Sequence, residues 1–366
     1  MVPQDMAQRN AVVDLLRMAF AFIIVLHHLW IQADFRICGY LAVDFFFLVS
    51  GYMVIMSCRR NQENGKEIGT IRYCAHKFMS FLPYLIFAEV VAGIISGAIS
   101  FDKYDDFPRA CEAVWDHLKN ILCLSMLNFY RGDVTWYLSA LMISTAILYP
   151  IIRKSKVVFP RFVAPVIGVV LVVLILVETG RINAPSTIMY GFVKTGLVRG
   201  LGEMCLGVFA FECISMTKRF FFSKENIVLG IIEMGCYLAV LICIFVINPE
   251  KVNREVFEFL MVVLLFVALT ITLSNRSITY EWVQKWPWAC NNSTVLATGS
   301  LLIYLNHTYL IEFWDQWGSG DWIGKDIFVI IFAILMSIAC YHAAKYIRAG
   351  IVNMVKSSVN DQKING

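Results

Sequence analysis

The hydrophobic residues of this chain gather in long stretches instead of alternating with polar residues. Many of these stretches approach the roughly 20 residues that a helix needs to cross about 30 Å of hydrocarbon. They predict spans near residues 11–31, 39–58, 78–99, 134–152, 161–179, 193–213, 227–247, 255–274, 294–314 and 325–347. The pattern therefore predicts an all-α, polytopic integral membrane protein with about ten transmembrane helices in a single bundle.

Composition supports the membrane interpretation. Of the 366 residues, 59% are hydrophobic and 16% are charged, whereas soluble domains have about 45–50% apolar and about 25% charged residues. This composition argues against a soluble enzyme. The sequence shows no internal repeat and no appended soluble region, so we expect one transmembrane domain over residues 1–366.

The distribution of cations predicts the orientation. An even number of spans places both termini on one side, and the loops of that side contain more Lys and Arg than the opposite loops. The cations on the side of the termini are Arg59, Arg60, Lys66, Arg72, Lys77, Arg153, Lys154, Lys156, Arg161, Lys218, Arg219, Lys224, Arg276 and Lys285. The positive-inside rule then predicts cytoplasmic termini. The net charge of +4 mostly reflects this asymmetry, so we expect no nucleic-acid partner. In the long external loop, 100–133, we expect a short interfacial helix.

The first span carries the candidate chemistry. Ionisable residues are costly inside a membrane and mark functional sites by default. Arg17 and His28 are eleven residues apart, which is about three helical turns or some 16 Å, so they share one face. Asp14 lies one turn before Arg17 and can pair with it.

Arg17 suits phosphate binding, and a neutral His28 can take a proton from a hydroxyl. Alternatively, Arg17 reaches lipid phosphates and His28 caps the interface. The residues alone do not choose between these alternatives. His27 points about 100° away from His28, and for His27 we expect a structural role.

These residues resemble the membrane acyltransferase type 3 family. The first helix of that family carries an arginine, ten intervening residues and a histidine within a pattern like L-D-x-L-R, and the stretch here reads VVDLLRMAFAFIIVLHH. The next span, GYLAVDFFFLVSGYMV, is similar to the family segment G-x-x-G-V-D-x-F-F-x-x-S-G-[FY]. Two later stretches, WYLSALMISTAILYP and IYLNHTYLI, resemble the fourth helix and the late Y-L-x-H segment. The resemblance thus extends along the whole chain.

The chain departs from the family at two places. Where the family has R-R-x-x-R-x-x-P, this chain has HKFMSFLP, in which Lys77 keeps the basic character and Ser80 replaces the second arginine. Many members have a glutamate where Leu141 stands here, so no acid role is carried over to that position.

The resemblance implies transfer of an acyl group, commonly acetyl, from cytoplasmic acyl-CoA to a hydroxyl of an extracytoplasmic glycan. His28 would be the general base, Arg17 would also belong to the catalytic site, and Asp44 would orient the imidazole ring. Asp14, Arg17 and Lys77 would bind the donor. The expected partners are the lipid bilayer, acyl-CoA and a saccharide acceptor, and the expected location is a bacterial plasma membrane. We expect no permanently bound cofactor, and no cysteine or histidine spacing predicts a metal site.

Four residues are candidates for binding the acceptor. Trp136, Arg199, Glu203 and Trp314 are predicted near the external side, where aromatic faces and charges could contact a sugar. The alternatives are interfacial anchoring by the tryptophans and a structural i,i+4 ion pair between Arg199 and Glu203.

Two further hypotheses concern the mechanism and the class of protein. Ser50 is a conceivable nucleophile, although the neighbouring Gly51 suggests helix packing at this point of the second span. The rival class is a multi-pass transporter or flippase of a glycan or lipid-linked substrate without acyl-transfer activity. Such transporters commonly have two similar halves with broken helices, and this sequence shows no such correspondence.

Overall fold

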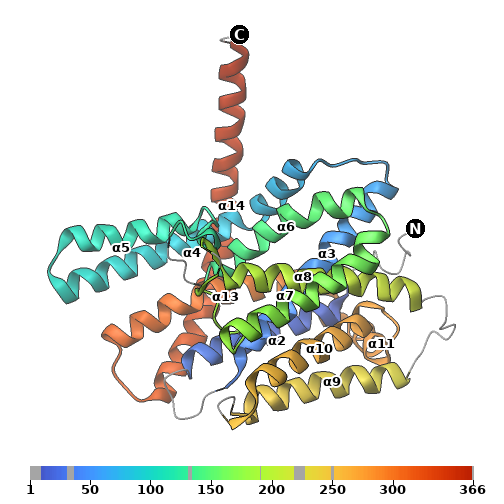
Figure 1. Ribbon diagram of the computed structural model, residues 1–366. Coiled ribbons are helices and arrows are strands. Elements are labelled where there is room, and N and C mark those ends of the chain that lie inside the picture. Colours follow the sequence, from blue (N-terminus) through green and yellow to red (C-terminus); the bar gives the residue numbers. More distant parts are fainter. Residues whose placement is uncertain are drawn as a thin grey trace. The chain divides into compact units, whose positions relative to one another are not determined.

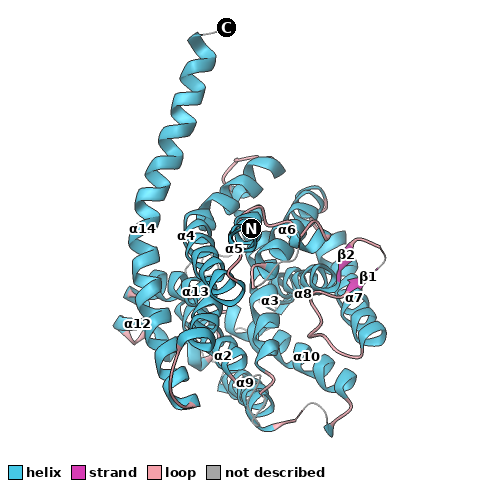
Figure 2. Cartoon of the chain, turned by 90° about the vertical axis from the view of Figure 1, so that its left-hand side faces the viewer, coloured by secondary structure: helices cyan, strands magenta, loops and turns pink. Residues whose placement is uncertain are grey.

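The computed structural model describes residues 10–30, 37–130, 134–189, 191–217, 227–248 and 251–364, and these are mostly helical (Figure 1, Figure 2). The longer helices are α2 (Ala11–Leu29), α3 (Ala42–Glu63), α4 (Thr70–Tyr104), α5 (Phe107–Asn120), α6 (Trp136–Lys154), α7 (Ala164–Thr179), α8 (Thr195–Thr217), α9 (Ile227–Val246), α10 (Arg254–Leu273), α13 (Ser293–Trp317) and α14 (Trp322–Ile364). The shorter elements are η1 (Gly39–Leu41), η2 (Ser125–Leu127), η3 (Phe159–Val163), α11 (Ile278–Gln284), α12 (Pro287–Asn291), and the paired strands β1 (Ile188–Met189) and β2 (Val193–Lys194). Every predicted span falls on a helix, which confirms the all-α, polytopic class.

Within the described residues, eight helices are long and apolar enough to cross a membrane. They are α2, η1 with α3, α4, α6, η3 with α7, α9, α10 and α14 as far as Ile351. The predicted spans 193–213 and 294–314 correspond to α8 and α13, which have 23 and 25 residues but are richer in polar side chains. In α8 these include Arg199 and Glu203, which belong to the candidate site.

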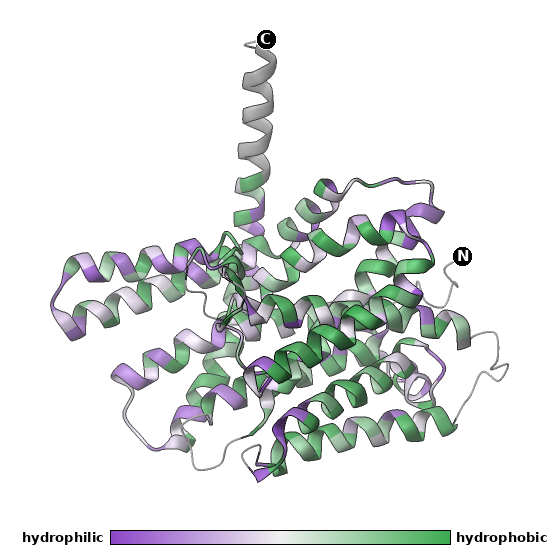
Figure 3. Ribbon diagram, in the orientation of Figure 1, coloured by the Kyte–Doolittle hydropathy of each residue, from purple (hydrophilic) through white to green (hydrophobic). Residues whose placement is uncertain are grey.

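Helix α7 consists largely of hydrophobic residues (Figure 3). Its sequence, APVIGVVLVVLILVET, contains one ionisable residue, and side chains such as Val166, Val170 and Val177 are exposed. A soluble protein rarely leaves so large a continuous apolar surface uncovered. The exposed face of α7 is therefore a surface for lipid.

Internal contacts divide the chain into two compact units. Unit 1 comprises Met1–Cys74 and Cys123–Leu301, and unit 2 comprises Ala75–Leu122 and Leu302–Gly366. Two of the three boundaries fall inside α4 and α13, so each of these helices contributes to both units, and the third follows α5. The units are described separately below, and the single transmembrane domain stays a prediction.

Helix α8 is the central element of unit 1, where it packs against α3, α6, α7 and α10. It crosses α3 at two glycines that permit close approach of the backbones. A Cβ atom at Gly51 would lie 2.0 Å from the carbonyl oxygen of Met204, and one at Gly207 would lie 2.1 Å from that of Leu48. The close approach confirms helix packing at Gly51.

In unit 2, α5 runs back along α4 as the second arm of a helical hairpin (Figure 1). The side chain of Asp106 caps α5 by accepting from the backbone N–H of Arg109, and Pro108 follows in the first turn. Both features favour a helix start. The short helix predicted within residues 100–133 is thus present.

Candidate active site

The N-terminal end of α2 is anchored to the C-terminal end of α10. Asn10 caps α2 by accepting from the backbone N–H groups of Val12 and Val13, at 2.9 and 3.2 Å. Its amide nitrogen donates to the carbonyl of Thr272 at 2.8 Å and to Oδ1 of Asn275 at 2.7 Å. The helix with the candidate chemistry is therefore held at its start by a side chain that satisfies both elements.

The predicted pair of Asp14 and Arg17 is present on α2. Nη1 of Arg17 donates to Oδ1 of Asp14 at 3.1 Å, and Oδ2 of Asp14 accepts from the hydroxyl of Ser293 at the start of α13. The Asp14 side chain is 3% exposed, whereas that of Arg17 is 23% exposed. The carboxylate thus lessens the cost of the guanidinium in the membrane, while part of the Arg17 side chain remains accessible.

Helices α3 and α6 meet α2 near Arg17. Tyr137 of α6 is close enough to Arg17 to interact with it electrostatically. The hydroxyl of Tyr137 also lies 3.4 Å from Oγ of Ser50 on α3. Helices α2, α3 and α6, which all resemble the family pattern, are therefore linked near Arg17.

The backbone of α2 orients His28. Nδ1 of His28 lies 2.9 Å from the carbonyl oxygen of Ile24, one turn earlier. Because a carbonyl oxygen only accepts, Nδ1 carries the proton, and Nε2 is the basic nitrogen of the neutral ring. Oδ1 of Asp44, the residue expected to orient the ring, accepts from Arg199 of α8, and its role toward His28 stays a prediction.

His27 occupies a packed position beside His28. Its side chain is buried, and Nδ1 lies 2.9 Å from the carbonyl oxygen of Ile37. Its ring centre is 5.5 Å from that of Tyr40, and a Cβ atom at Gly39 would lie 2.6 Å from the Cβ of His27. These contacts fit the structural role expected for this histidine.

The predicted pair of Arg199 and Glu203 belongs to a larger buried cluster. Nε of Arg199 donates to Asp44 Oδ1 at 3.0 Å and to Glu203 Oε1 at 2.9 Å. Nη2 donates to the same Asp44 oxygen and, at 3.0 Å, to the carbonyl of Tyr40. The guanidinium carbon lies 6.0 Å from the ring centre of Trp136. The cluster therefore joins η1, α3, α6 and α8.

This cluster is closed to solvent. The side chains of Asp44, Arg199 and Glu203 are each at most 1% exposed. Two carboxyl groups share one guanidinium, and three buried atoms, Asp44 Oδ2, Arg199 Nη1 and Glu203 Oε2, have no hydrogen-bond partner within the described part of the chain. The structure thus brings together three of the four predicted acceptor residues: Arg199 and Glu203 are buried in the core, and Trp136 is half-buried. Their role in binding an acceptor stays a prediction.

Sequence reasoning missed a second ionic cluster. Oε1 of Glu258 accepts from the hydroxyl of Tyr40 at 2.5 Å and from Nε of Arg254 at 2.8 Å. Oε2 of Glu258 accepts from the backbone N–H of Ile182. The i,i+4 spacing of Arg254 and Glu258 was the only local signal for it, because the other partners come from distant segments.

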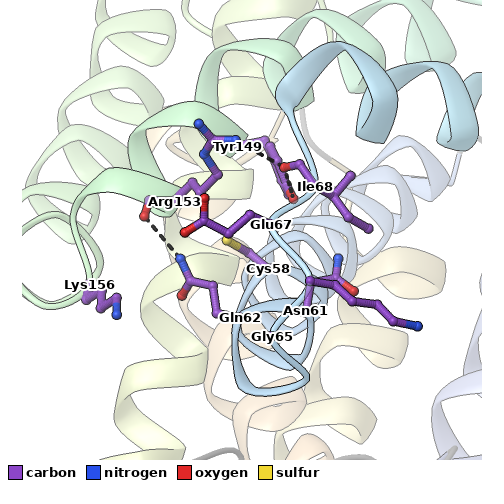
Figure 4. Close-up of a pocket in the computed structure, with 10 residues that line it drawn as sticks. Cys58, Asn61, Gln62, Gly65, Glu67, Ile68, Tyr149, Arg153 and Lys156 are labelled. Atoms are coloured by element: carbon purple, nitrogen blue, oxygen red, sulfur yellow. Dashed lines mark hydrogen bonds between the residues drawn. The ribbon is translucent and has the colours of Figure 1, made fainter.

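A pocket of about 380 Å³ opens beside the ends of α3 and α6 (Figure 4). Its lining residues are Cys58, Asn61, Gln62, Gly65, Lys66, Glu67, Ile68, Tyr149, Arg153 and Lys156. The hydroxyl of Tyr149 and Nη1 of Arg153 each donate to the carbonyl of Ile68 at 3.2 Å. The amide of Gln62 donates to the carbonyl of Arg153 at 3.1 Å. These bonds fix the loop after α3 against α6.

The charge of the pocket is mainly positive. Lys66, Arg153 and Lys156 outnumber Glu67, and both lysines are exposed. Nη2 of Arg59 donates to the carbonyl of Lys156 at 2.7 Å and adds a further cation beside the pocket. A concave surface with several cations attracts phosphate groups. The sequence marked these residues only as cytoplasmic charges, because the pocket forms when the loop meets α6.

An acyltransferase domain model matches residues 10–342, which include α2 and nearly all the other elements described above. The chain belongs to the membrane acyltransferase type 3 family. No curated protein and no solved structure matches it. The family membership confirms the prediction of an enzyme, an acyltransferase. It does not support the alternative of a transporter or flippase without acyl-transfer activity.

The remaining predicted site residues of the acyltransferase lie in unit 2. Lys77 is a half-buried residue of α4, and its carbonyl accepts from the hydroxyl of Ser80 at 2.6 Å. Trp314 of α13 packs against Phe328 of α14, with ring centres 5.0 Å apart. Their roles in donor and acceptor binding stay predictions. Among the described residues, no group of three or more His, Cys, Asp and Glu is placed to hold a metal ion.

Proposed function

We propose that this acyltransferase moves an acyl group, most simply acetyl, from cytoplasmic acyl-CoA to a hydroxyl of an extracytoplasmic glycan. The observation that supports this best is the arrangement of charges on α2. The partly exposed side chain of Arg17 and the imidazole of His28 stand about three turns apart on one helix. Arg17 therefore suits an anionic donor, and His28 suits a neutral acceptor hydroxyl.

In this proposal, His28 is the general base. Nε2 takes the proton of the acceptor hydroxyl while the hydroxyl oxygen attacks the thioester carbonyl carbon. The C–S bond then breaks, and the protonated imidazole returns the proton to the leaving sulfur. The hydrogen bond from Nδ1 to the carbonyl of Ile24 holds the tautomer that this step requires. The transfer is direct, without an acyl-enzyme on the histidine.

The basic pocket supports the donor half of the proposal. The 3′-phosphate and the diphosphate of CoA are multiply charged, and Lys66, Arg153 and Lys156 offer complementary charge. Lysines act as point charges toward phosphate, whereas arginine can bind it through two parallel N–H groups. The positive-inside distribution puts this pocket on the cytoplasmic side, where acyl-CoA is found.

The same distribution supports an extracytoplasmic acceptor. With the start of α2 in the cytoplasm, His28 near its end belongs to the external half of the membrane. A bacterial plasma membrane with a surface glycan as acceptor fits this orientation. Acetyl is proposed as the acyl group because it is the common substrate implied by the family.

The test is transfer of radiolabelled acetyl from acetyl-CoA to extracted surface glycan, with the full-length protein in proteoliposomes. We expect label on the glycan with the wild type, and a decrease of about 10²–10⁴-fold in His28→Ala, the usual contribution of a general base. His342→Ala is the matched control, since His342 is an exposed residue of α14. Undiminished transfer by His28→Ala would overturn the base, and no transfer by the wild type would overturn the donor or the acceptor.

A further inference from the structure

Unit 2 contains a hydrogen-bonded series of side chains that the proposed function does not use. Nε2 of His117 lies 2.9 Å from Oγ of Ser96, and Nδ1 of His117 lies 2.9 Å from Oε2 of Glu89. The amide of Asn120 donates to the same Glu89 oxygen at 3.1 Å. Ser96 and Glu89 belong to α4, whereas His117 and Asn120 belong to α5. Hydrogen bonds therefore link a hydroxyl to an imidazole and the imidazole to a carboxylate.

The close packing of α4 and α5 positions these groups. A Cβ atom at Gly93 would lie 3.3 Å from the Cβ of His117, and one at Gly97 would lie 2.9 Å from Cγ2 of Val114. The two glycines thus let α5 lie directly against α4. Glu89 and Ser96 are seven residues apart, or about two turns on nearly the same face, so the ring of His117 can bridge them.

The donors and acceptors fit the roles of a nucleophile, a base and an orienting acid. A carboxylate only accepts, so Nδ1 of His117 carries the proton toward Glu89, and Nε2 of the neutral ring can accept from Ser96. The side chain of Glu89 is 6% exposed and that of His117 is 15% exposed. Such a geometry characterises an activated nucleophile on unrelated folds.

The serine is reachable from the surface of unit 2. Ser96 is half-buried, and its hydroxyl can also donate to Oε2 of the exposed Glu312 on α13, at 3.2 Å. α5 carries solvent-type charges, including an ion pair between Lys119 and Asp116. These charges make α5 a polar neighbour of α4, and the charge of Glu312 favours uncharged substrates over anionic ones.

We propose that Ser96 is the nucleophile of a second catalytic site, with His117 as base and Glu89 as orienting acid, acting on uncharged O-acyl esters. Oγ of Ser96 attacks the ester carbonyl carbon as its proton passes to Nε2 of His117. The bond to the ester's alkoxy oxygen breaks, and the leaving alcohol takes that proton. Water then attacks the acyl-serine with His117 again as base, which releases the carboxylic acid and restores Ser96. This esterase activity is independent of the acyl-CoA reaction.

The experiment is labelling of the purified full-length protein with a fluorophosphonate probe, which forms a P–O bond to an activated serine with loss of fluoride. We expect the probe on Ser96 in peptide mass spectra, and hydrolysis of p-nitrophenyl acetate by the same protein. Both signals should be absent in Ser96→Ala. Ser100→Ala, one turn further along α4, is the matched control and should label as the wild type does.

His117→Gln separates catalysis from packing, because glutamine keeps a hydrogen-bonding side chain at this place but supplies no base. We expect labelling at least about 100-fold slower with the unfolding temperature unchanged. If folded wild type leaves Ser96 unlabelled, or if His117→Gln labels at the wild-type rate, the series only pins α5 to α4 and the proposal is overturned.

Discussion

Two arginines of unit 1 show how differently the protein uses the same side chain. Arg17 on α2 pairs with one carboxylate, Asp14, and keeps 23% of its side chain exposed. Arg199 on α8 contacts two carboxyl groups, those of Asp44 and Glu203, as well as a backbone carbonyl, and is 1% exposed. Arg17 can therefore still bind a ligand, whereas the hydrogen bonds of Arg199 are directed to the fold.

An ionisable residue in a span is therefore not by itself a binding residue. Both arginines are candidate functional residues, because a charge is costly in hydrocarbon. Both also pair with a carboxylate three or four residues away on the same helix. What separates them is the number of partners from other helices and the remaining exposure. We therefore expect substitutions at α8 to affect stability first and substitutions at α2 to affect transfer first.

The largest effect is expected from Arg199→Ala. Removal of the guanidinium leaves Asp44 and Glu203 buried without their common partner, which typically costs about 3–5 kcal/mol. We expect a large decrease in the unfolding temperature of the purified protein, measured by tryptophan fluorescence in detergent. A stable Arg199→Ala variant would contradict the structural assignment of this cluster.

A matched variant sharpens that test. The triple variant carries Arg199→Met, Asp44→Leu and Glu203→Met. It removes the three charges together, so the cluster leaves no unpaired charge in the core. Replacing a whole buried ionic group by apolar residues is often neutral or stabilising. We expect the triple variant to unfold at a higher temperature than Arg199→Ala, and the reverse order would show that the ions themselves stabilise the protein.

The next effect is expected from Arg17→Lys. Lysine keeps the charge and can still pair with Asp14, but it lacks the planar fork that binds phosphate. We expect about a tenfold loss in kcat/KM for acetyl-CoA, the size of one charge-assisted hydrogen bond of about 1.5 kcal/mol. The unfolding temperature should not change. A large decrease in it would show that Arg17, like Arg199, mainly stabilises the fold.

The smallest effect is expected at the basic pocket. Lys66→Gln and Lys156→Gln each remove an exposed cation, and exposed pairs contribute about 0.2–1 kcal/mol. We expect KM for acetyl-CoA to rise by up to about fivefold in each variant, with kcat retained and the effect reduced at high salt. Lys154→Gln is the control, since Lys154 is exposed but does not line the pocket. Equal effects in all three variants would exclude a specific phosphate site.

Local patterns in the sequence predicted much of the fold and part of the site. The long apolar runs predicted each of the longer helices except α5, because a helix must satisfy its own backbone in a membrane. The pairs Asp14 with Arg17 and Arg199 with Glu203 followed from i,i+3 and i,i+4 spacing, which any helix brings together.

Contacts between distant segments could not be predicted in this way. Arg199 and Asp44 are 155 residues apart, and Ser293 and Asp14 are 279 residues apart. The orientation of His28 by Asp44 stays a prediction, and the partner that the structure shows for Asp44, the guanidinium of Arg199, comes from a distant segment. The pocket likewise depends on how the loop after α3 folds onto α6.

The most direct measurement is acetyl transfer per folded molecule by His28→Asn. The asparagine amide can replace Nδ1–H as a donor to the carbonyl of Ile24, but it has no nitrogen that can act as a base. We predict a protein that folds as the wild type does and transfers acetyl about 10²–10⁴-fold more slowly. Transfer by folded His28→Asn at the wild-type rate would contradict the assignment of Nε2 as the base, and with it the account of α2 as the catalytic helix.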